Sequence, residues 1–169
     1  AQAKQAGDFV ELYLRRIHDF WDHPDRQLFD GPTQRGVQSF FENGGDICHV
    51  FGVCVESADE LRLPSGIMGT LTPVLDRLRA EEDLALLLVP SAAYMRCHID
   101  ADGGVRADVE ALYDELLEHC REMNNRFLVM DAPQGLHGGL LERWVRGMRS
   151  RHPENRAFGA IYYPWLQSG

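Results

Sequence analysis

The residues best suited to chemistry follow an apolar run near the middle of the second half of the chain. Asp131 comes directly after Phe127 to Met130, and His137 lies six residues further on, beyond Pro133. In an open parallel sheet, ligands bind beyond the carboxyl ends of the strands, which is where this pair would lie. With His98, the pair could serve a hydrolase-like or metal-assisted reaction. One carboxylate and one histidine without a nucleophile define no reaction class, however, and Asp before Pro commonly braces a loop. We therefore favour the bracing role.

Other catalytic patterns are absent from the sequence. No glycine fingerprint follows the apolar run that ends at Val55, and no GxxxxGK[ST] loop occurs in a chain whose one lysine is Lys4. Ser91 is not part of a GxSxG elbow, and no two histidines have HExxH spacing. His49 lies within an apolar run and is interpreted as a strand residue rather than a ligand. The sequence thus predicts no enzymatic activity, no cofactor and no metal site.

Composition narrows the possible partners. The 169 residues carry a formal net charge of -9, which disfavours binding to nucleic acid and to anionic membranes. The longest apolar run, Leu84 to Val89, is too short to span a bilayer. A hydrophobic fraction of 44% is enough to build a core without disulfides. We expect the four cysteines to be free, buried thiols of a cytoplasmic protein.

Helical and strand-like segments alternate along the chain. The periodicity predicts helices over residues 8–20, 33–43, 70–82, 106–125 and 138–150, and strands over residues 47–55, 84–89, 127–130 and 157–163. Such alternation indicates an α/β fold with a mainly parallel four-stranded sheet flanked by helices, and with an extra helix at the N-terminus. We divide the chain into residues 1–32, a helix and linker, and residues 33–169, the α/β domain.

Several local signals mark the ends of these elements. Asp8 and Thr33 are candidate N-caps, and Asn43-Gly44-Gly45 is a strong helix stop because both residue types tolerate the left-handed conformation. A second turn is expected at Asp102-Gly103-Gly104, inside a loop over residues 91–104. The helix over residues 106–125 has the clearest apolar face. That face comprises Val109, Leu112, Tyr113, Leu116, Leu117 and Cys120.

Three passages together resemble the contractile-tail sheath proteins of phages and related injection machines. The passages are Gly36 to Val50 with its Phe-Glu-Asn-Gly-Gly turn, Arg126-Phe127-Leu128-Val129-Met130-Asp131-Ala132-Pro133, and Ala160-Ile161-Tyr162-Tyr163-Pro164-Trp165-Leu166. The last is similar to the family's A-x-Y-Y-P-W segment and is the most specific of the three. Their order and spacing also fit the family, and they cover residues 36–166.

The resemblance implies a structural role. A sheath subunit, or an excised domain of one, stacks in helical rings around a tail tube and contacts copies of itself, the tube and the baseplate. Its location would be the virion tail or the host cytoplasm, and the role requires no active site. The alternatives are the strand-end Asp/His enzyme described above and a regulatory binding module without catalysis.

Candidate contact residues lie in the last third of the chain. Arg143, Arg146, Arg149 and Arg151 could form one basic patch on an acidic molecule, or simply a solvated helix face. Tyr163 and Trp165 could form an aromatic contact, or pack where a strand ends before Pro164. Helical stacks need two different patches that meet, which a basic patch on an acidic molecule would supply.

Overall fold

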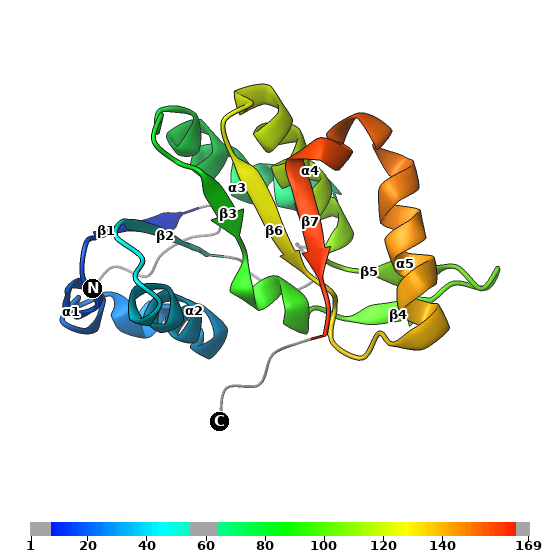
Figure 1. The fold of residues 1–169 in the computed structure, drawn as a ribbon, viewed down its shortest axis with the longest axis horizontal. Helices are drawn as coiled ribbons and strands as arrows, with labels where there is room; N and C mark the ends of the chain where they lie inside the picture. Colours follow the sequence, from blue (N-terminus) through cyan, green and yellow to red (C-terminus); the bar gives the residue numbers. More distant parts are fainter. Residues whose placement is uncertain (1–7, 55–63, 165–169) are drawn as a thin grey trace.

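The described part of the chain folds into three small sheets surrounded by helices. The computed structural model describes residues 8–54 and 64–164 (Figure 1). The elements are β1 (Phe9–Leu14), α1 (Ile17–Trp21), η1 (Arg26–Leu28), α2 (Gly31–Glu42), β2 (Cys48–Val53), α3 (Pro64–Arg79), β3 (Leu86–Leu88), η3 (Pro90–Tyr94), β4 (Cys97–Ile99), β5 (Val105–Ala107), α4 (Glu110–Met123), β6 (Phe127–Asp131), α5 (Gly138–Arg151), η4 (Pro153–Phe158) and β7 (Gly159–Tyr162). Among the described residues, no helix is both long and apolar enough to cross a bilayer.

The central sheet is parallel and has three strands in the order β3-β6-β7. Leu87 pairs with Leu128, and Met130 pairs with Ile161. The expected α/β architecture is therefore confirmed, and Figure 1 shows the three strands side by side with α5 beyond β7. The prediction of a four-stranded sheet is wrong, because β2, the expected fourth strand, pairs with β1 instead.

The N-terminal segment is a strand followed by a short helix, so the predicted single helix over residues 8–20 is wrong. β1 pairs with β2 in an antiparallel sheet, with Phe9 opposite Val53 and Leu14 opposite Cys48. Val10, Leu12 and Leu14 are buried on one face, which is the period of two that a strand requires. The pairing joins residues on either side of position 32, and the domain boundary there stays a prediction.

Two further expectations about the middle of the chain are wrong. The stretch predicted as one loop contains β4, which forms a hairpin with β5, and the helix expected from residue 106 starts at Glu110. The turn between β4 and β5 lies where Asp102-Gly103-Gly104 predicts it, with Gly103 at φ 79°. The helix expected over residues 70–82 spans Pro64–Arg79.

The strand predicted over residues 84–89 is the shorter β3, and it is exposed on one face rather than buried. Leu86 and Leu88 point to the same face of this edge strand and are 57% and 54% exposed. Only the intervening Leu87 packs against the core.

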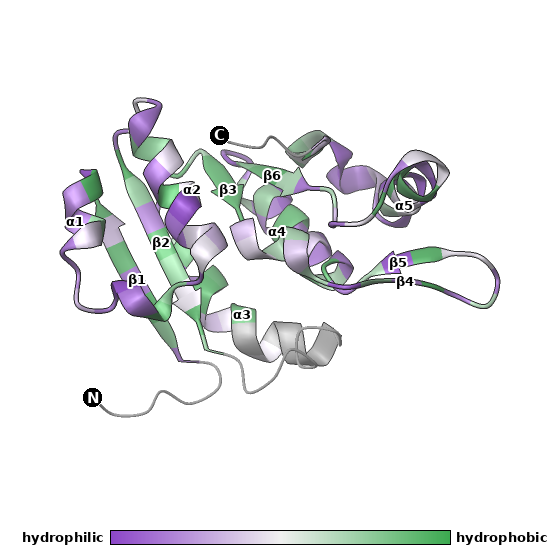
Figure 2. Cartoon of the chain, turned by 90° about the horizontal axis from the view of Figure 1, so that it is seen from below, coloured by the Kyte–Doolittle hydropathy of each residue, from purple (hydrophilic) through white to green (hydrophobic). Residues whose placement is uncertain are grey.

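Two hydrophobic clusters stabilise the described residues. The larger one joins α3, α4, α5 and the central sheet, and includes Leu128, Trp144 and the whole apolar face predicted for α4. The smaller one is formed by Val10, Leu12, Leu14, Phe20, Phe29, Val37 and Val50. It lies between the β1–β2 sheet and helices α1 and α2. We refer to strands β1 and β2 with helices α1 and α2 as the β1–β2 layer, and Figure 2 shows it beside the rest of the molecule.

Both predicted N-caps are wrong, and the first of them, Asp8, precedes the strand β1 rather than a helix. The N-cap of α2 is Asp30, whose carboxylate accepts a hydrogen bond from the Thr33 amide at 2.8 Å, rather than Thr33 itself. The predicted stop after α2 is confirmed, since Gly44 has a φ of 86°. Asn124 ends α4 in the left-handed conformation at φ 54°.

A buried arginine ties the end of α3 to α4 and β6. Arg126 is only 4% exposed and donates hydrogen bonds to the carbonyls of Leu78 and Glu81, at 2.9 and 2.7 Å. Its guanidinium also lies 3.1 Å from Nε2 of the buried His119. Orphan carbonyls at a helix end need such donors, so this side chain positions Glu81.

Candidate functional site

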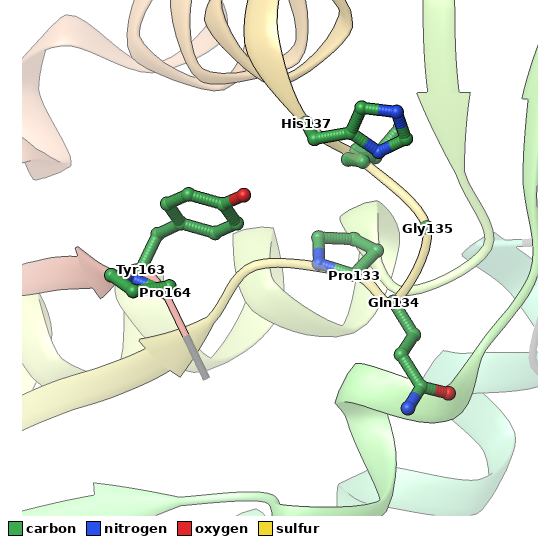
Figure 3. Close-up of a pocket in the computed structure, with 7 residues that line it drawn as sticks. Pro133, Gln134, Gly135, His137, Tyr163 and Pro164 are labelled. Atoms are coloured by element: carbon green, nitrogen blue, oxygen red, sulfur yellow. The ribbon is translucent and has the colours of Figure 1, made fainter. Parts of the chain in front are cut away.

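A pocket lies at the carboxyl end of the central sheet, between the exits of β6 and β7. It encloses about 270 Å³ and is lined by Pro133, Gln134, Gly135, Leu136, His137, Tyr163 and Pro164. In Figure 3 the Tyr163 ring lies to one side of Pro133 and the His137 ring lies above it, while the Gln134 side chain points away from both rings. Two of the three passages that resemble sheath proteins therefore meet at one site.

The strand-end enzyme candidates are not assembled into one group. His137 lines the pocket, but Asp131 does not, although desolvation raises the pKa of its carboxyl group. His98 is 55% exposed in β4 and lies 3.5 Å from Asp100. Within residues 8–54 and 64–164, no hydrogen bond or ion pair joins the side chains of Asp131, His137 and His98. The pocket offers an imidazole, an amide and a phenol among prolines, without a paired nucleophile and base.

The backbone of Asp131 is held by a buried tyrosine. The Tyr113 hydroxyl donates to the Asp131 carbonyl at 3.1 Å and lies 3.3 Å from the Asp131 amide. Burial raises the pKa of Tyr113, so the hydroxyl stays protonated and can make both contacts. The strand exit is thus braced through its backbone by α4, which keeps the pocket wall in place.

The four arginines of the predicted basic patch have different environments. Arg151 is 22% exposed and pairs with Glu110 and Asp114 of α4, at 2.7 and 3.0 Å. Arg143 donates to the carbonyl of Gly103 in the β4–β5 turn at 3.2 Å. The C-terminal end of α5 is therefore fastened to α4, and its second turn to the β4–β5 turn.

The middle of α5 leaves two arginines exposed. Arg146 and Arg149 form no ion pair with any residue in the described part of the chain, and they lie three positions apart on the helix. We refer to these two side chains as the α5 basic pair. Their role in a subunit contact stays a prediction.

The aromatic candidates lie on β7 and just beyond it. Tyr162 and Tyr163 are 58% and 49% exposed, and β7 is an edge strand of the central sheet. Trp165, the third member of this aromatic segment, lies outside the described residues. An exposed aromatic pair on an unpaired strand edge is a surface typical of protein contacts.

A second cluster was missed by the sequence reasoning. It consists of three residues whose possible metal-ligand atoms all lie within 4.8 Å of one another: Glu11, His49 and Glu81. Arg77 forms ion pairs with the two glutamates. Arg77 binds Glu11 through Nε and Nη2, at 3.0 and 2.9 Å, and Glu81 through Nη1. These hydrogen bonds raise the pKa of Arg77. The cluster could be found only by placing Glu11 and His49 on the same face of paired strands.

The cysteines carry no candidate chemistry in the described residues. Cys48, Cys54, Cys97 and Cys120 are all free, as predicted, although only Cys120 is fully buried. Desolvation raises the pKa of Cys48 and of Cys120 to about 11, so both remain thiols rather than nucleophilic thiolates near neutral pH.

No protein-family model and no curated protein matches the sequence. The resemblance to sheath proteins therefore depends on the three passages alone and stays a prediction.

Proposed function

We propose that this chain is a structural subunit, or one domain of a subunit, of a contractile tail sheath, and that it assembles into helical rings around a tail tube. In this role it contacts further copies of itself, the tail tube and the baseplate, in a virion tail or an equivalent particle. The proposal rests first on the three passages that resemble sheath proteins.

The observation that carries the proposal furthest is the position of two of those passages. The exit of β6 and the Tyr162-Tyr163-Pro164 segment meet at one end of the sheet, where they line the pocket and expose two tyrosines. The pocket is walled by Pro133, Leu136 and Pro164, which suits an apolar side chain of a neighbouring subunit. The described residues that line the pocket include no paired nucleophile and base, which covalent catalysis would need.

Charge supports the same interpretation. The α5 basic pair is exposed on a chain of net charge -9, so it has acidic surface available on any second copy. A contact between a basic patch and a different, acidic patch is heterologous, and heterologous contacts generate rings and helical stacks.

The test is electron microscopy of the protein expressed from its complete reading frame. We expect rings or tubes with a regular axial repeat at low salt, and fewer of them as salt screens the charges. Discrete particles of one small size under all conditions would contradict the proposal.

A charge-reversal pair sharpens the test. Arg146→Glu with Arg149→Glu should abolish or strongly reduce assembly while leaving the far-UV circular dichroism unchanged, because both side chains are exposed. The matched control is Arg15→Glu with Arg96→Glu, which makes the same change in net charge at exposed arginines outside α5. Equal loss of assembly in both pairs would show that net charge matters rather than this surface.

A further inference from the structure

The cluster of Glu11, His49 and Glu81 joins the β1–β2 layer to the end of α3. Glu11 and His49 lie on the same face of the paired strands, since Glu11 is opposite Phe51 and Tyr13 is opposite His49. Glu81 follows α3 and is positioned by the bond from Arg126 to its carbonyl. Three metal-ligating side chains from three segments thus converge where the two hydrophobic clusters meet.

His49 has an unused nitrogen that points into this cluster. Its side chain is only 9% exposed, and its Nδ1 lies 4.0 Å from a carboxylate oxygen of Glu11, too far for a hydrogen bond. Nδ1 is buried and has no hydrogen-bond partner. A buried polar atom without a partner carries a free-energy cost, which a ligand at this point would remove.

The imidazole is also held in place by neighbouring rings. The Tyr13 ring stacks edge-on against it with centroids 4.5 Å apart, and the Phe51 ring lies 6.4 Å away. A ligand whose orientation is fixed before binding loses little conformational freedom on binding, so the nitrogen is preorganised.

We propose that Glu11, His49 and Glu81 form a binding site for a divalent transition-metal ion of the Zn²⁺ type. One imidazole nitrogen with two carboxylates is a ligand set that Zn²⁺ accepts, whereas Mg²⁺ and Ca²⁺ prefer oxygen ligands alone. Water would complete the coordination. This site is independent of the proposed sheath role.

The geometry requires a modest contraction. Ligand atoms around a tetrahedral Zn²⁺ lie about 3.4 Å apart, as follows from metal–ligand distances near 2.1 Å. The three atoms here lie within 4.8 Å of one another, so they must approach by on the order of 1 Å. Glu11 and Glu81 are each 27% exposed, and rotation of their side chains can supply that movement.

Arg77 holds the two carboxylates together when no metal is bound. Its guanidinium bridges Glu11 and Glu81, and its side chain is 36% exposed, so it can move into solvent when a cation replaces it. Such partly exposed ion pairs contribute little net stability, and their loss does not prevent metal binding. Arg77 therefore competes with the metal, and its removal should strengthen binding.

The test is calorimetric titration of the tag-free chain with Zn²⁺ under reducing conditions. We expect one Zn²⁺ per chain, bound at least about tenfold more weakly by His49→Gln and by Glu81→Gln, because even the loss of an outer-shell partner costs about 10- to 100-fold. Arg77→Gln should bind Zn²⁺ more tightly than the unsubstituted chain. Mg²⁺ at millimolar concentration should not compete.

Two controls separate this site from others. His98→Gln removes an exposed histidine beside Asp100, and Cys48→Ser removes a thiol whose side chain alternates to the other face of β2 from His49. Both should bind Zn²⁺ as the unsubstituted chain does. Circular dichroism checks that each variant is folded.

Three outcomes would overturn the proposal. They are unaltered affinity in both His49→Gln and Glu81→Gln, loss of binding in Cys48→Ser alone, and no Zn²⁺ binding by either the unsubstituted chain or Arg77→Gln. A second readout is hydrogen exchange, in which Zn²⁺ should slow exchange in β1 and β2 because the metal fastens that layer to Glu81.

Discussion

The unit of α4 and β6 and the layer of β1 and β2 differ in how far their partners lie along the chain. α4 runs directly into β6, and the two pack together in the larger cluster. β1, by contrast, is separated from β2 in the sequence by helices α1 and α2, yet the two strands pair, with Phe9 opposite Val53. The first arrangement is specified by a local pattern and the second by a distant partner.

That difference explains which predictions were right. The apolar face of α4 has helical spacing alone, whereas the segment from Phe9 to Phe20 contains apolar residues that fit two periods. Phe9, Leu12 and Tyr13 suggest a helix, but Val10, Leu12 and Leu14 alternate as in a strand. Pairing with β2 decides between them, as tertiary context commonly overrides propensity.

The largest expected effect compares one buried leucine from each region. Leu128→Ala in β6 should lower the free energy of unfolding by about 2–5 kcal/mol, because Leu128 is fully buried. Leu12→Ala in β1, where Leu12 is 2% exposed, should cost a similar amount within the smaller cluster. Urea denaturation followed by circular dichroism measures both.

Hydrogen exchange shows whether the two regions open together. We expect Leu12→Ala to speed exchange in β1 and β2 but not in α4 and β6, and Leu128→Ala to speed it throughout. If Leu12→Ala speeds exchange equally in α4 and β6, the two regions form one cooperative unit and do not open independently.

A smaller effect concerns pH and the buried histidine of α4. Burial, followed by the charges of Arg126 and Arg79, lowers the pKa of His119 to about 4, although Glu122 opposes the shift. The folded state therefore binds this proton more weakly than the unfolded state. The resulting stability is fully present above pH 6.5, the ordinary histidine pKa, and is lost as pH falls toward 4. The change amounts to about 3 kcal/mol.

His119→Gln isolates this contribution because the amide oxygen can still accept from Arg126 but does not titrate in this range. The difference in unfolding free energy between the two chains should change between pH 6.5 and pH 4 and be flat above pH 7. His98→Gln, at an exposed site, is the matched control for replacing a histidine with glutamine. A parallel pH dependence in the unsubstituted chain and His119→Gln would refute the assignment.

The smallest effect concerns the N-cap of α2, a helix of the β1–β2 layer. Asp30→Ala should lower the free energy of unfolding by about 1 kcal/mol, because the Thr33 amide loses its partner. Thr33→Ala should cost less, since the Thr33 side chain is not the cap. Thermal or urea unfolding of both variants measures the difference, and a larger loss in Thr33→Ala would restore the cap predicted from the sequence.

The features whose causes are local follow from the sequence alone. Such features depend on residues within a few positions of one another. They include the apolar face of α4, the helix stop at Gly44, the turn at Gly103 and the strand ending at Asp131. The mixed α/β character is also of this kind, since it follows from alternating short strands and helices. The passages that resemble sheath proteins are also continuous stretches of sequence.

The pairing of strands and the contacts between distant side chains depend on the tertiary structure. β2 has the composition of a central parallel strand but lies beside β1, so the expected four-stranded sheet has three strands. The pocket between Pro133 and Tyr163 depends on β6 and β7 being neighbours. The cluster of Glu11, His49 and Glu81 likewise depends on segments that are distant in the sequence. The periodicity of one segment does not show which distant segment it pairs with.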